Sequence, residues 1–280
     1  MLPNYTVNIM AWLRSPIKGV MLDISGVLKN GNVAIPGSIE AVQRLRKCGL
    51  KLRFVTNETQ LSRHDLTEKL RRIGFQLHEN EVFPPAPAMV ETLKGLRLNP
   101  MLLVHPKVLI DFKDVDQSNP NCVVVGDAAE HFTYERMNSA FRLLMELKNP
   151  KLFTLGRGRY YLEEDGLCLD VGCFTTALEF ATGLKAEVVG KPSSSFFATP
   201  LKDMGLDSSE VVMIGDDIES DVGGAQKCGM RGVLVRTGKF RPERDENHPN
   251  VKPDAVVNDL AQGVELILSS ESFKSLIKHE

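Results

Sequence analysis

Residues 19–26 read Gly-Val-Met-Leu-Asp-Ile-Ser-Gly, and this stretch decides the fold class. Its apolar run stops at Asp23, which is the pattern of a buried strand that delivers an acid at its carboxyl end. Alternate side chains of an extended chain point to opposite sides, so Asp23 and Ser25 share one side while Ile24 turns into the core. Gly26 lets the backbone turn away from a closely approaching ligand. We therefore expect a functional site at the end of this strand.

Segments further along the chain repeat a strand–helix pattern. Strands are predicted at residues 52–55, 186–189, 211–214, 232–236 and 255–257, and helices at 39–48, 62–73, 196–204, 221–228 and 260–268. Ser38 is the predicted N-cap of the first of these helices. Strands that alternate with helices at this spacing predict an α/β fold with a parallel sheet.

A second α/β stretch interrupts this pattern. Its predicted strands are 101–105, 122–125 and 152–155, and its predicted helices are 134–147 and 174–182. The proline-rich residues 83–87 predict a hinge that leads into it. The simplest account is one domain inserted into another, with a core of residues 1–84 and 186–280 around an insert of residues 85–185. Before Gly19 we expect an N-terminal extension, with Trp12 as a packing residue.

Polar residues directly follow four of the predicted strands: Asp23, Thr56-Asn57, Lys191 and Asp216-Asp217. The carboxyl ends of parallel strands form the ligand crevice of an open sheet, so these residues should converge. Carboxylates suit Mg²⁺, which bridges to phosphate oxygens, and a lysine fits beside them if an anion lies between it and the metal. A carboxylate at the first strand end can also act as a nucleophile that forms an aspartyl-phosphate.

Each of these four blocks of polar residues, taken alone, could have a purely structural role. Asp23 could be a loop or cap residue, Thr56-Asn57 could form a turn, and Lys191 could lie in a solvated turn. Asp221 could cap the helix that follows it as well as it could support Asp216. The adjacent acids at 216–217 are more specific, because two acids that end a buried strand destabilise it unless they are paired or bind metal. All four blocks in this order favour a phosphate site.

The four blocks resemble the signature of the haloacid dehalogenase superfamily of phosphotransferases. The matching segments are Leu22–Val27, Phe54–Asn57, Gly190–Pro192 and Met213–Asp217 with Asp221. The resemblance implies a Rossmann-like core with a parallel sheet and an inserted α/β cap of the C2 type.

The same resemblance implies roles for individual residues. Asp23 would be the nucleophile, and Mg²⁺ would be held by Asp23, the main-chain oxygen of Ser25 and Asp216. The substrate would be bound by Asp23, Ile24, Ser25, Thr56, Asn57 and Lys191, while Asp217 and Asp221 would lie behind the metal ligands. The resemblance also implies a homodimer formed through the cap.

Ser25 departs from the usual superfamily pattern, in which a second aspartate acts as acid and base two residues after the nucleophile. Serine is a poor proton donor, and a positioned acid contributes about 10²–10⁴ in rate. We therefore expect substrates whose leaving group needs little protonation, such as phosphohistidine, phospholysine, imidodiphosphate and inorganic pyrophosphate. The alternatives are a hydrolase of other small phosphate esters, and a weakly catalytic scaffold that binds phosphoproteins. Retention of both Asp23 and Lys191 speaks against the scaffold.

The composition limits the classes of partner. The 280-residue chain has a formal net charge of −2, which gives no bulk attraction to nucleic acid or anionic membranes. Five cysteines without CxxC spacing favour reduced thiols and a cytoplasmic location, and we expect the nucleus as a second one. Six histidines show no ligand spacing, so we expect surface or packing roles and no zinc site. Residues 156–161 form a basic aromatic loop that could face the active site or be a plain cap turn.

Overall fold

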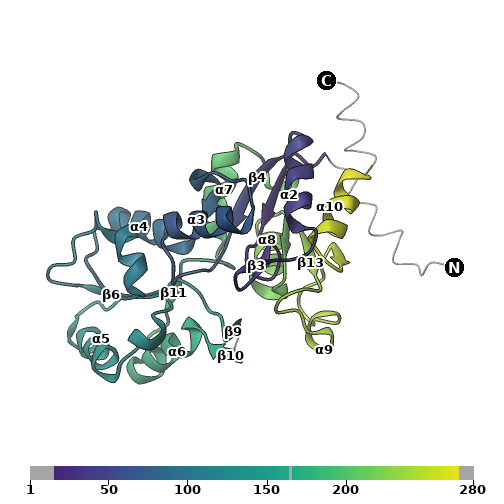
Figure 1. Cartoon of the computed structure of the whole chain (residues 1–280). Coiled ribbons are helices and arrows are strands. Elements are labelled where there is room, and N and C mark those ends of the chain that lie inside the picture. Colours follow the sequence, from purple (N-terminus) through teal and green to yellow (C-terminus); the bar gives the residue numbers. More distant parts are fainter. Residues whose placement is uncertain (1–15, 164–165, 271–280) are drawn as a thin grey trace. The chain divides into compact units, whose positions relative to one another are not determined.

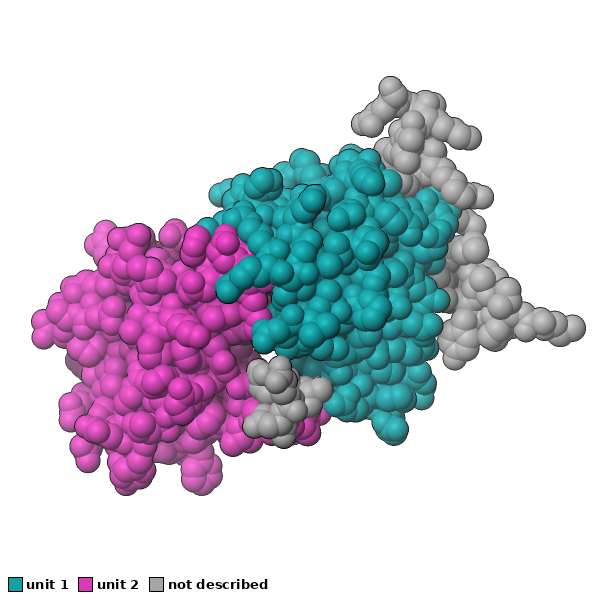
Figure 2. All heavy atoms as spheres, viewed as in Figure 1, with its two compact units in different colours: residues 1–55, 70–81, 197–280 teal, residues 56–69, 82–196 magenta. Residues whose placement is uncertain are grey.

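The structure is a computed structural model that describes residues 16–163 and 166–270. Trp12 and most of the expected N-terminal extension lie outside these residues. Tertiary contacts group the chain into two compact units: unit 1 comprises residues 1–55, 70–81 and 197–280, and unit 2 comprises residues 56–69 and 82–196 (Figure 2). The domain limits drawn from the sequence, with an insert of residues 85–185, stay a prediction.

Unit 1 is built on a parallel sheet in which β1 is an interior strand, between β12 and β4. Its strands follow the order β14 (Ala255–Val257), β13 (Arg231–Val235), β12 (Val211–Gly215), β1 (Gly19–Leu22), β4 (Lys51–Val55). In the register, Leu22 of β1 pairs with Ile214 of β12 on one side and Phe54 of β4 on the other. Every residue of β1 is buried, because an interior parallel strand is covered on both faces.

The helices outside the inserted stretch follow the expected alternation with strands. They are α2 (Ser38–Lys47), α3 (Arg63–Ile73), α7 (Ser194–Met204), α8 (Gly224–Lys227), α9 (Pro242–Asp245) and α10 (Leu260–Leu268). α2 and α10 lie side by side (Figure 1) and are joined by an ion pair of 2.7 Å between Arg44 and Glu265.

Unit 2 has three layers. Its parallel sheet has the order β11 (Glu187–Val188), β8 (Leu152–Thr154), β7 (Cys122–Val125), β6 (Pro100–Leu103). Alternate residues of β7 pack to opposite sides: Cys122 and Val124 join the cluster formed with α4 (Pro85–Leu96), while Val123 and Val125 join the cluster formed with α5 (Tyr134–Glu146) and α6 (Val171–Thr182). Figure 1 shows α4 on one side of the sheet and α5 and α6 on the other. The continuous apolar run of β7 is the sequence pattern of a strand that is buried on both faces.

The remaining elements are short. They are the hairpins β2 (Lys29–Asn30) with β3 (Val33–Ala34) and β9 (Tyr160–Glu163) with β10 (Gly166–Leu169), strand β5 (Val82–Phe83), 3₁₀ turns at Glu79–Glu81, Pro106–Phe112, Ala129–His131 and Ser208–Glu210, and a π turn at Ile218–Gly223. Within the described residues, no helix combines the length and the apolar character that a membrane crossing requires.

Two of three local predictions were wrong. The N-cap of α2 is Gly37, and Ser38 instead donates from its Oγ to the Leu28 carbonyl at 2.9 Å, which ties the helix to the preceding loop. The hinge expected at residues 83–87 stays a prediction; its second half begins helix α4, since Pro85 at the first helical position lacks only an N–H that would be unsatisfied there. The helix expected at 221–228 is a π turn followed by α8, and its N-cap is Asp217.

Candidate active site

Asp23 and Asp216 are brought together by the register of β1 and β12. Because Leu22 pairs with Ile214, the residues that follow these two strands lie at one sheet edge. The Asp23 N–H continues the pairing by donating to the Ile214 carbonyl at 3.0 Å. The sequence prediction that these two acids converge at the carboxyl ends of the strands is therefore confirmed within unit 1.

Three buried carboxylates form the centre of the site. One oxygen each from Asp23, Asp216 and Asp221 lies within 4.8 Å of the other two, and the residues are 6%, 2% and 0% exposed. Asp221 comes from the π turn after β12, and its Oδ2 accepts the Asp217 N–H at 3.1 Å. Asp221 therefore lies beside Asp23 and Asp216, and its expected place behind the metal ligands stays a prediction.

The crowding of like charges perturbs Asp216. Burial raises its pKa well above the usual range, and the nearby charge of Asp23 raises it further. The charge of Lys239 opposes this shift, and the charge of Asp221 adds to it. Such a group of acids is stable in its ionised form only when positive charge compensates it.

The donor set fits Mg²⁺. Clustered carboxylate oxygens are the ligands that a hard divalent cation prefers. Two glycines allow the backbone to close around Asp216, because a Cβ at Gly26 or at Gly238 would collide with its Oδ2. Both glycines have a left-handed backbone, with φ of 86° and 62°. No larger residue fits these positions without displacing the carboxylate.

Asp217 has a local structural role. Its Oδ1 accepts the N–H groups of Glu219 and Ser220 at 3.1 and 2.9 Å, so it caps the π turn that carries Asp221. The predicted alternative that Asp221 caps this segment is wrong, because the turn begins at Ile218, three residues earlier than expected, and its N-cap is Asp217.

The two residues after Asp23 differ in exposure, as the alternation of side chains along an extended chain requires. Ile24 is fully buried and Ser25 is exposed, so Ile24 can reach a substrate only through its main chain. Lys29 is buried, and its Nζ donates to Ser25 Oγ at 3.4 Å. No pattern in the sequence indicates Lys29, because its place depends on the unpredicted β2–β3 hairpin.

The loop after β13 also contributes to the site. The main-chain N–H of Lys239 donates to Asp216 Oδ2 at 2.7 Å, and the Thr237 hydroxyl donates to the Gly26 carbonyl. The spacing of Lys239 could not predict this role, because the contact is made by a main-chain group, which every residue type other than proline carries. Arg241 instead donates its N–H to buried Asp245 at 2.7 Å.

The other predicted phosphate-binding residues lie in unit 2. Asn57 Nδ2 donates to the Lys191 carbonyl at 2.9 Å, and the Lys191 N–H donates to Asn57 Oδ1 at 2.8 Å. Thr56 is buried, and its Oγ1 accepts the Glu58 N–H at 3.1 Å. The structure therefore joins Asn57 to Lys191, which are far apart in sequence. That this pair and Thr56 serve the same reaction as the carboxylates of unit 1 stays a prediction.

The basic aromatic loop of unit 2 is held by side-chain contacts. Arg157 forms an ion pair with buried Glu179 at 2.9 Å, and the Tyr161 hydroxyl accepts from Gln60 Nε2 at 2.8 Å. Gln60 also donates to buried Asp127 at 2.7 Å. A Cβ added at Gly156 would lie 3.8 Å from Asn57 Nδ2, so the start of the loop lies beside the Asn57–Lys191 pair.

Comparison with known proteins identifies the family. A haloacid dehalogenase-like hydrolase model matches residues 20–118, and a HAD-hydrolase-like model matches residues 188–263. The chain is 57% identical over 256 residues to phospholysine phosphohistidine inorganic pyrophosphate phosphatase from Bos taurus, covering 90% of this chain and 94% of the relative. The chain belongs to the haloacid dehalogenase-like hydrolases.

Two further members of this hydrolase family support the assignment. Haloacid dehalogenase-like hydrolase domain-containing protein 2 from Bos taurus is 45% identical and covers 91% of this chain and 97% of its own length. The p-nitrophenyl phosphatase from Archaeoglobus fulgidus is 29% identical, with a TM-score of 0.82 over 90% of this chain and 99% of that one. This haloacid dehalogenase-like hydrolase is thus a phosphatase with the expected α/β fold.

Proposed function

We propose that this phosphatase is Mg²⁺-dependent and hydrolyses P–N bonds in phosphohistidine, phospholysine and imidodiphosphate, and the P–O–P bond of inorganic pyrophosphate. The observation that carries the proposal is the cluster of buried carboxylates Asp23, Asp216 and Asp221 at the ends of β1 and β12. The name of the relative that is 57% identical supports the choice of substrates.

The reaction has two steps that both use Asp23. A carboxylate oxygen of Asp23 attacks phosphorus, the bond from phosphorus to the leaving nitrogen or oxygen breaks, and an aspartyl-phosphate forms. Water then attacks this intermediate, which releases phosphate and restores the carboxylate. Thr56, Asn57 and Lys191 bind the phosphoryl oxygens in this proposal, and Asn57 holds the main chain of Lys191 through its two hydrogen bonds.

Asp23, Asp216 and the main-chain oxygen of Ser25 would hold Mg²⁺, with Asp221 as a further carboxylate in the cluster. When bound, the ion would supply positive charge that offsets the negative charge of the phosphate oxygens. Asp217 maintains the π turn that presents Asp221, and the Lys239 N–H fixes one oxygen of Asp216.

Ser25 supports the choice of substrate class. Its hydroxyl cannot supply the proton that an alkoxide leaving group requires, whereas a protonated nitrogen or a phosphate leaves without one. Ser25→Asp should therefore raise kcat/KM on alkyl phosphate monoesters and leave phosphoramidate hydrolysis unchanged. Equal effects on both substrate classes would contradict the leaving-group argument.

The central test is release of phosphate from imidodiphosphate with and without Mg²⁺. Wild-type protein should turn over only with the metal, and Asp23→Asn should lose this turnover while it remains folded. Asp114→Asn, which changes an exposed aspartate, is the matched control and should retain full activity. Metal-dependent turnover that persists in Asp23→Asn would exclude Asp23 as the nucleophile.

A second candidate function is hydrolysis of other small phosphate esters. The 45% identity to haloacid dehalogenase-like hydrolase domain-containing protein 2 favours it. A panel of phosphate esters assayed beside imidodiphosphate and pyrophosphate separates the two functions, because each predicts the higher kcat/KM for a different group.

The proposal extends to the assembly and location of the phosphatase. We propose a homodimer formed through the cap and a location in the cytoplasm and the nucleus, where the free thiols of all five cysteines would stay reduced. Light scattering measures the first, and fluorescence of the tagged chain in cells measures the second.

A further inference from the structure

A second group of metal-ligating side chains lies in unit 2, at the carboxyl edge of its own parallel sheet. His105 follows β6, while Glu130 and His131 lie in the 3₁₀ turn that follows β7. These strands are neighbours, and Leu103 pairs with Val125, so the segments that leave them start side by side. The rule that ligands collect at the carboxyl ends of parallel strands applies here too.

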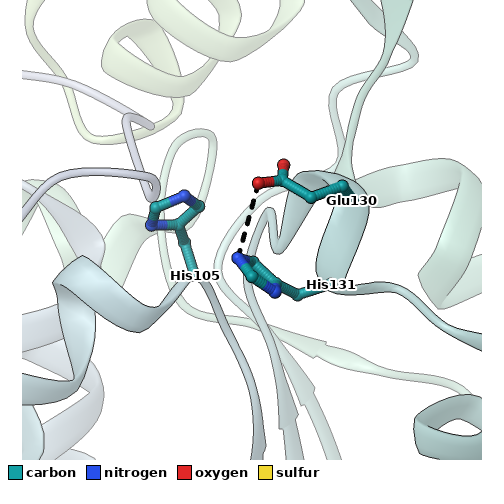
Figure 3. A group of neighbouring side chains, drawn as sticks. All are labelled: His105, Glu130 and His131. Carbon is teal, nitrogen blue, oxygen red and sulfur yellow. Dashed lines mark ion pairs between the residues drawn. The ribbon is translucent and has the colours of Figure 1, made fainter.

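The three side chains converge closely (Figure 3). One ligand atom each from His105, Glu130 and His131 lies within 4.8 Å of the other two. His131 Nε2 is 3.5 Å from Glu130 Oε1, and the two imidazole rings meet edge to face with centroids 5.4 Å apart. Two ligands bonded at about 2.0–2.1 Å to one tetrahedral ion lie about 3.4 Å apart, so the Glu130–His131 pair already has a suitable separation.

The chemistry of these donors differs from that of the Asp23 cluster. Two imidazoles and one carboxylate are the ligands of zinc sites that keep a fourth position for water, whereas Mg²⁺ selects oxygen donors. The Glu130 side chain is 76% exposed, so solvent can supply the fourth ligand.

We propose that His105, Glu130 and His131 form a binding site for Zn²⁺ or a similar transition-metal ion, separate from the carboxylate cluster of unit 1. The sequence predicts packing or surface roles for these histidines, because their spacing along the chain contains no ligand motif. The pairing of β6 with β7 brings them together. Edge-to-face packing with one His–Glu ion pair is the competing explanation, and it requires no metal.

Metal binding has a specific structural consequence at Lys107. The Lys107 N–H donates to His105 Nδ1 at 3.2 Å. If the metal binds Nδ1, it takes the lone pair that accepts this hydrogen bond; if it binds Nε2, the proton of the neutral ring must lie on Nδ1. In either case the hydrogen bond is lost. The amide resonance of Lys107 should therefore shift when zinc is added.

The test is a titration of the full-length protein, without an affinity tag and with excess Mg²⁺, by Zn²⁺ in a calorimeter. We expect one zinc ion per chain whose affinity falls at least about tenfold in His105→Ala and in His131→Ala. His78→Ala, which removes an exposed histidine outside the cluster, is the matched control and should bind zinc as the wild type does. The Lys107 amide should shift with the same saturation in the wild type and require at least about tenfold more zinc to shift in His131→Ala.

Cobalt substitution distinguishes this site from the free cysteines. Co²⁺ in the proposed site should show the visible bands of a tetrahedral ion without the thiolate charge-transfer band that a cysteine ligand adds. Zinc affinity that is unchanged in His105→Ala and His131→Ala, or a titration without zinc binding, would overturn the proposal. Because imidodiphosphate hydrolysis is measured separately, failure here leaves the function assigned to Asp23 intact.

Discussion

Gly26 and Gly238 are the residues that bring two separate loops against Asp216. Their Cα atoms face each other closely enough that a Cβ on Gly238 would lie 2.6 Å from the Cα of Gly26. Both have positive φ, which L side chains adopt at a cost of roughly 1–2 kcal/mol. Backbone strain and steric exclusion would therefore both oppose a larger residue at positions 26 and 238. The two effects can be separated experimentally, because a larger residue at some other glycines with positive φ would meet only the backbone strain.

Gly26→Ala tests the steric part. Its Cβ would occupy the position of Asp216 Oδ2, so we expect at least about tenfold weaker Mg²⁺ binding and a matching loss of activity. Gly31→Ala is the matched control, since Gly31 has φ of 55° but nothing within 4 Å of the added atom. Backbone strain should cost both variants about 1–2 kcal/mol of unfolding free energy. The collision with Asp216 should add to this loss in Gly26→Ala alone, and only Gly26→Ala should lose metal affinity. Equal Mg²⁺ dependence of the two would show that the contact with Asp216 is unimportant.

Asp216 links metal binding to stability. The pKa of Asp216 is raised in the folded protein, so folding favours the protonated carboxyl. Its contribution to the unfolding free energy is therefore complete below the unfolded pKa of about 3.9 and is lost as the pH rises through the folded pKa. At higher pH the ionised, buried carboxylate destabilises the metal-free protein. A bound cation reverses this effect by compensating the charge.

Asp216→Asn should therefore raise the unfolding free energy of the metal-free protein at neutral pH, and the gain should shrink as the pH is lowered. Mg²⁺ at about one hundred times its dissociation constant should stabilise the wild type by about 2.7 kcal/mol and the variant by much less. Urea unfolding with EDTA or Mg²⁺ measures both effects. An equal Mg²⁺ increment in both proteins would place the ion elsewhere.

At the scale of elements, Asn57 connects the segment after β4 with the segment after β11. Its side-chain amide makes two hydrogen bonds to the main chain of Lys191: Nδ2 donates to the carbonyl oxygen, and Oδ1 accepts from the N–H. The adjacent Gly190, with φ of 154°, allows the Asn57 side chain to approach, since a Cβ there would lie 3.0 Å from Asn57 Oδ1 and 2.6 Å from the Leu155 carbonyl oxygen. The amide thus sets where the main chain of Lys191 lies.

Asn57→Ala should displace Lys191 and lower kcat/KM for imidodiphosphate by about 10²-fold, because an error of about 1 Å in a binding group has that effect. Asn99→Ala is the matched control in the same unit. It also removes two side-chain hydrogen bonds, to Asp116 and Ser118. It should therefore lower the unfolding free energy by a similar amount without lowering kcat/KM. Comparable kinetic losses in both variants would reduce Asn57 to a general stabilising residue.

The elements that sequence predicts well are those with a strong apolar pattern. The strands at Cys122–Val125 and Ala255–Val257 and the helix at Leu260–Leu268 have the predicted limits, because buried runs and amphipathic periodicity are local properties. The π turn at Ile218–Gly223 was not predicted, since its hydrogen bonds depend on the cap formed by Asp217. The β2–β3 hairpin was missed for a related reason: strands of two residues carry no periodicity.

At the scale of the whole molecule, the inserted stretch was recognisable because a strand–helix pattern stops and later resumes. The tertiary contacts also place residues 56–69 in unit 2, although these residues directly follow strand β4 of unit 1 in the chain. The strand–helix pattern of the sequence cannot predict this assignment. Among the site residues, the acids at strand ends were predictable from strand direction. His105 and His131 were not, because only the pairing of β6 with β7 brings them together.

The proposed homodimer makes a prediction for the surface of unit 2. Phe180 of α6 is 92% exposed and is the most exposed of the large apolar side chains in the described part of the chain. Aromatic residues dominate the energetics of interfaces, where truncation of a central one costs 2 kcal/mol or more, which is about a 30-fold change in affinity. Phe180→Glu should therefore raise the dimer dissociation constant at least about 30-fold in light scattering. Val33→Glu, at an exposed position of β3 in unit 1, should leave it unchanged, and a dimer that is equally stable in both variants would exclude Phe180 from the interface.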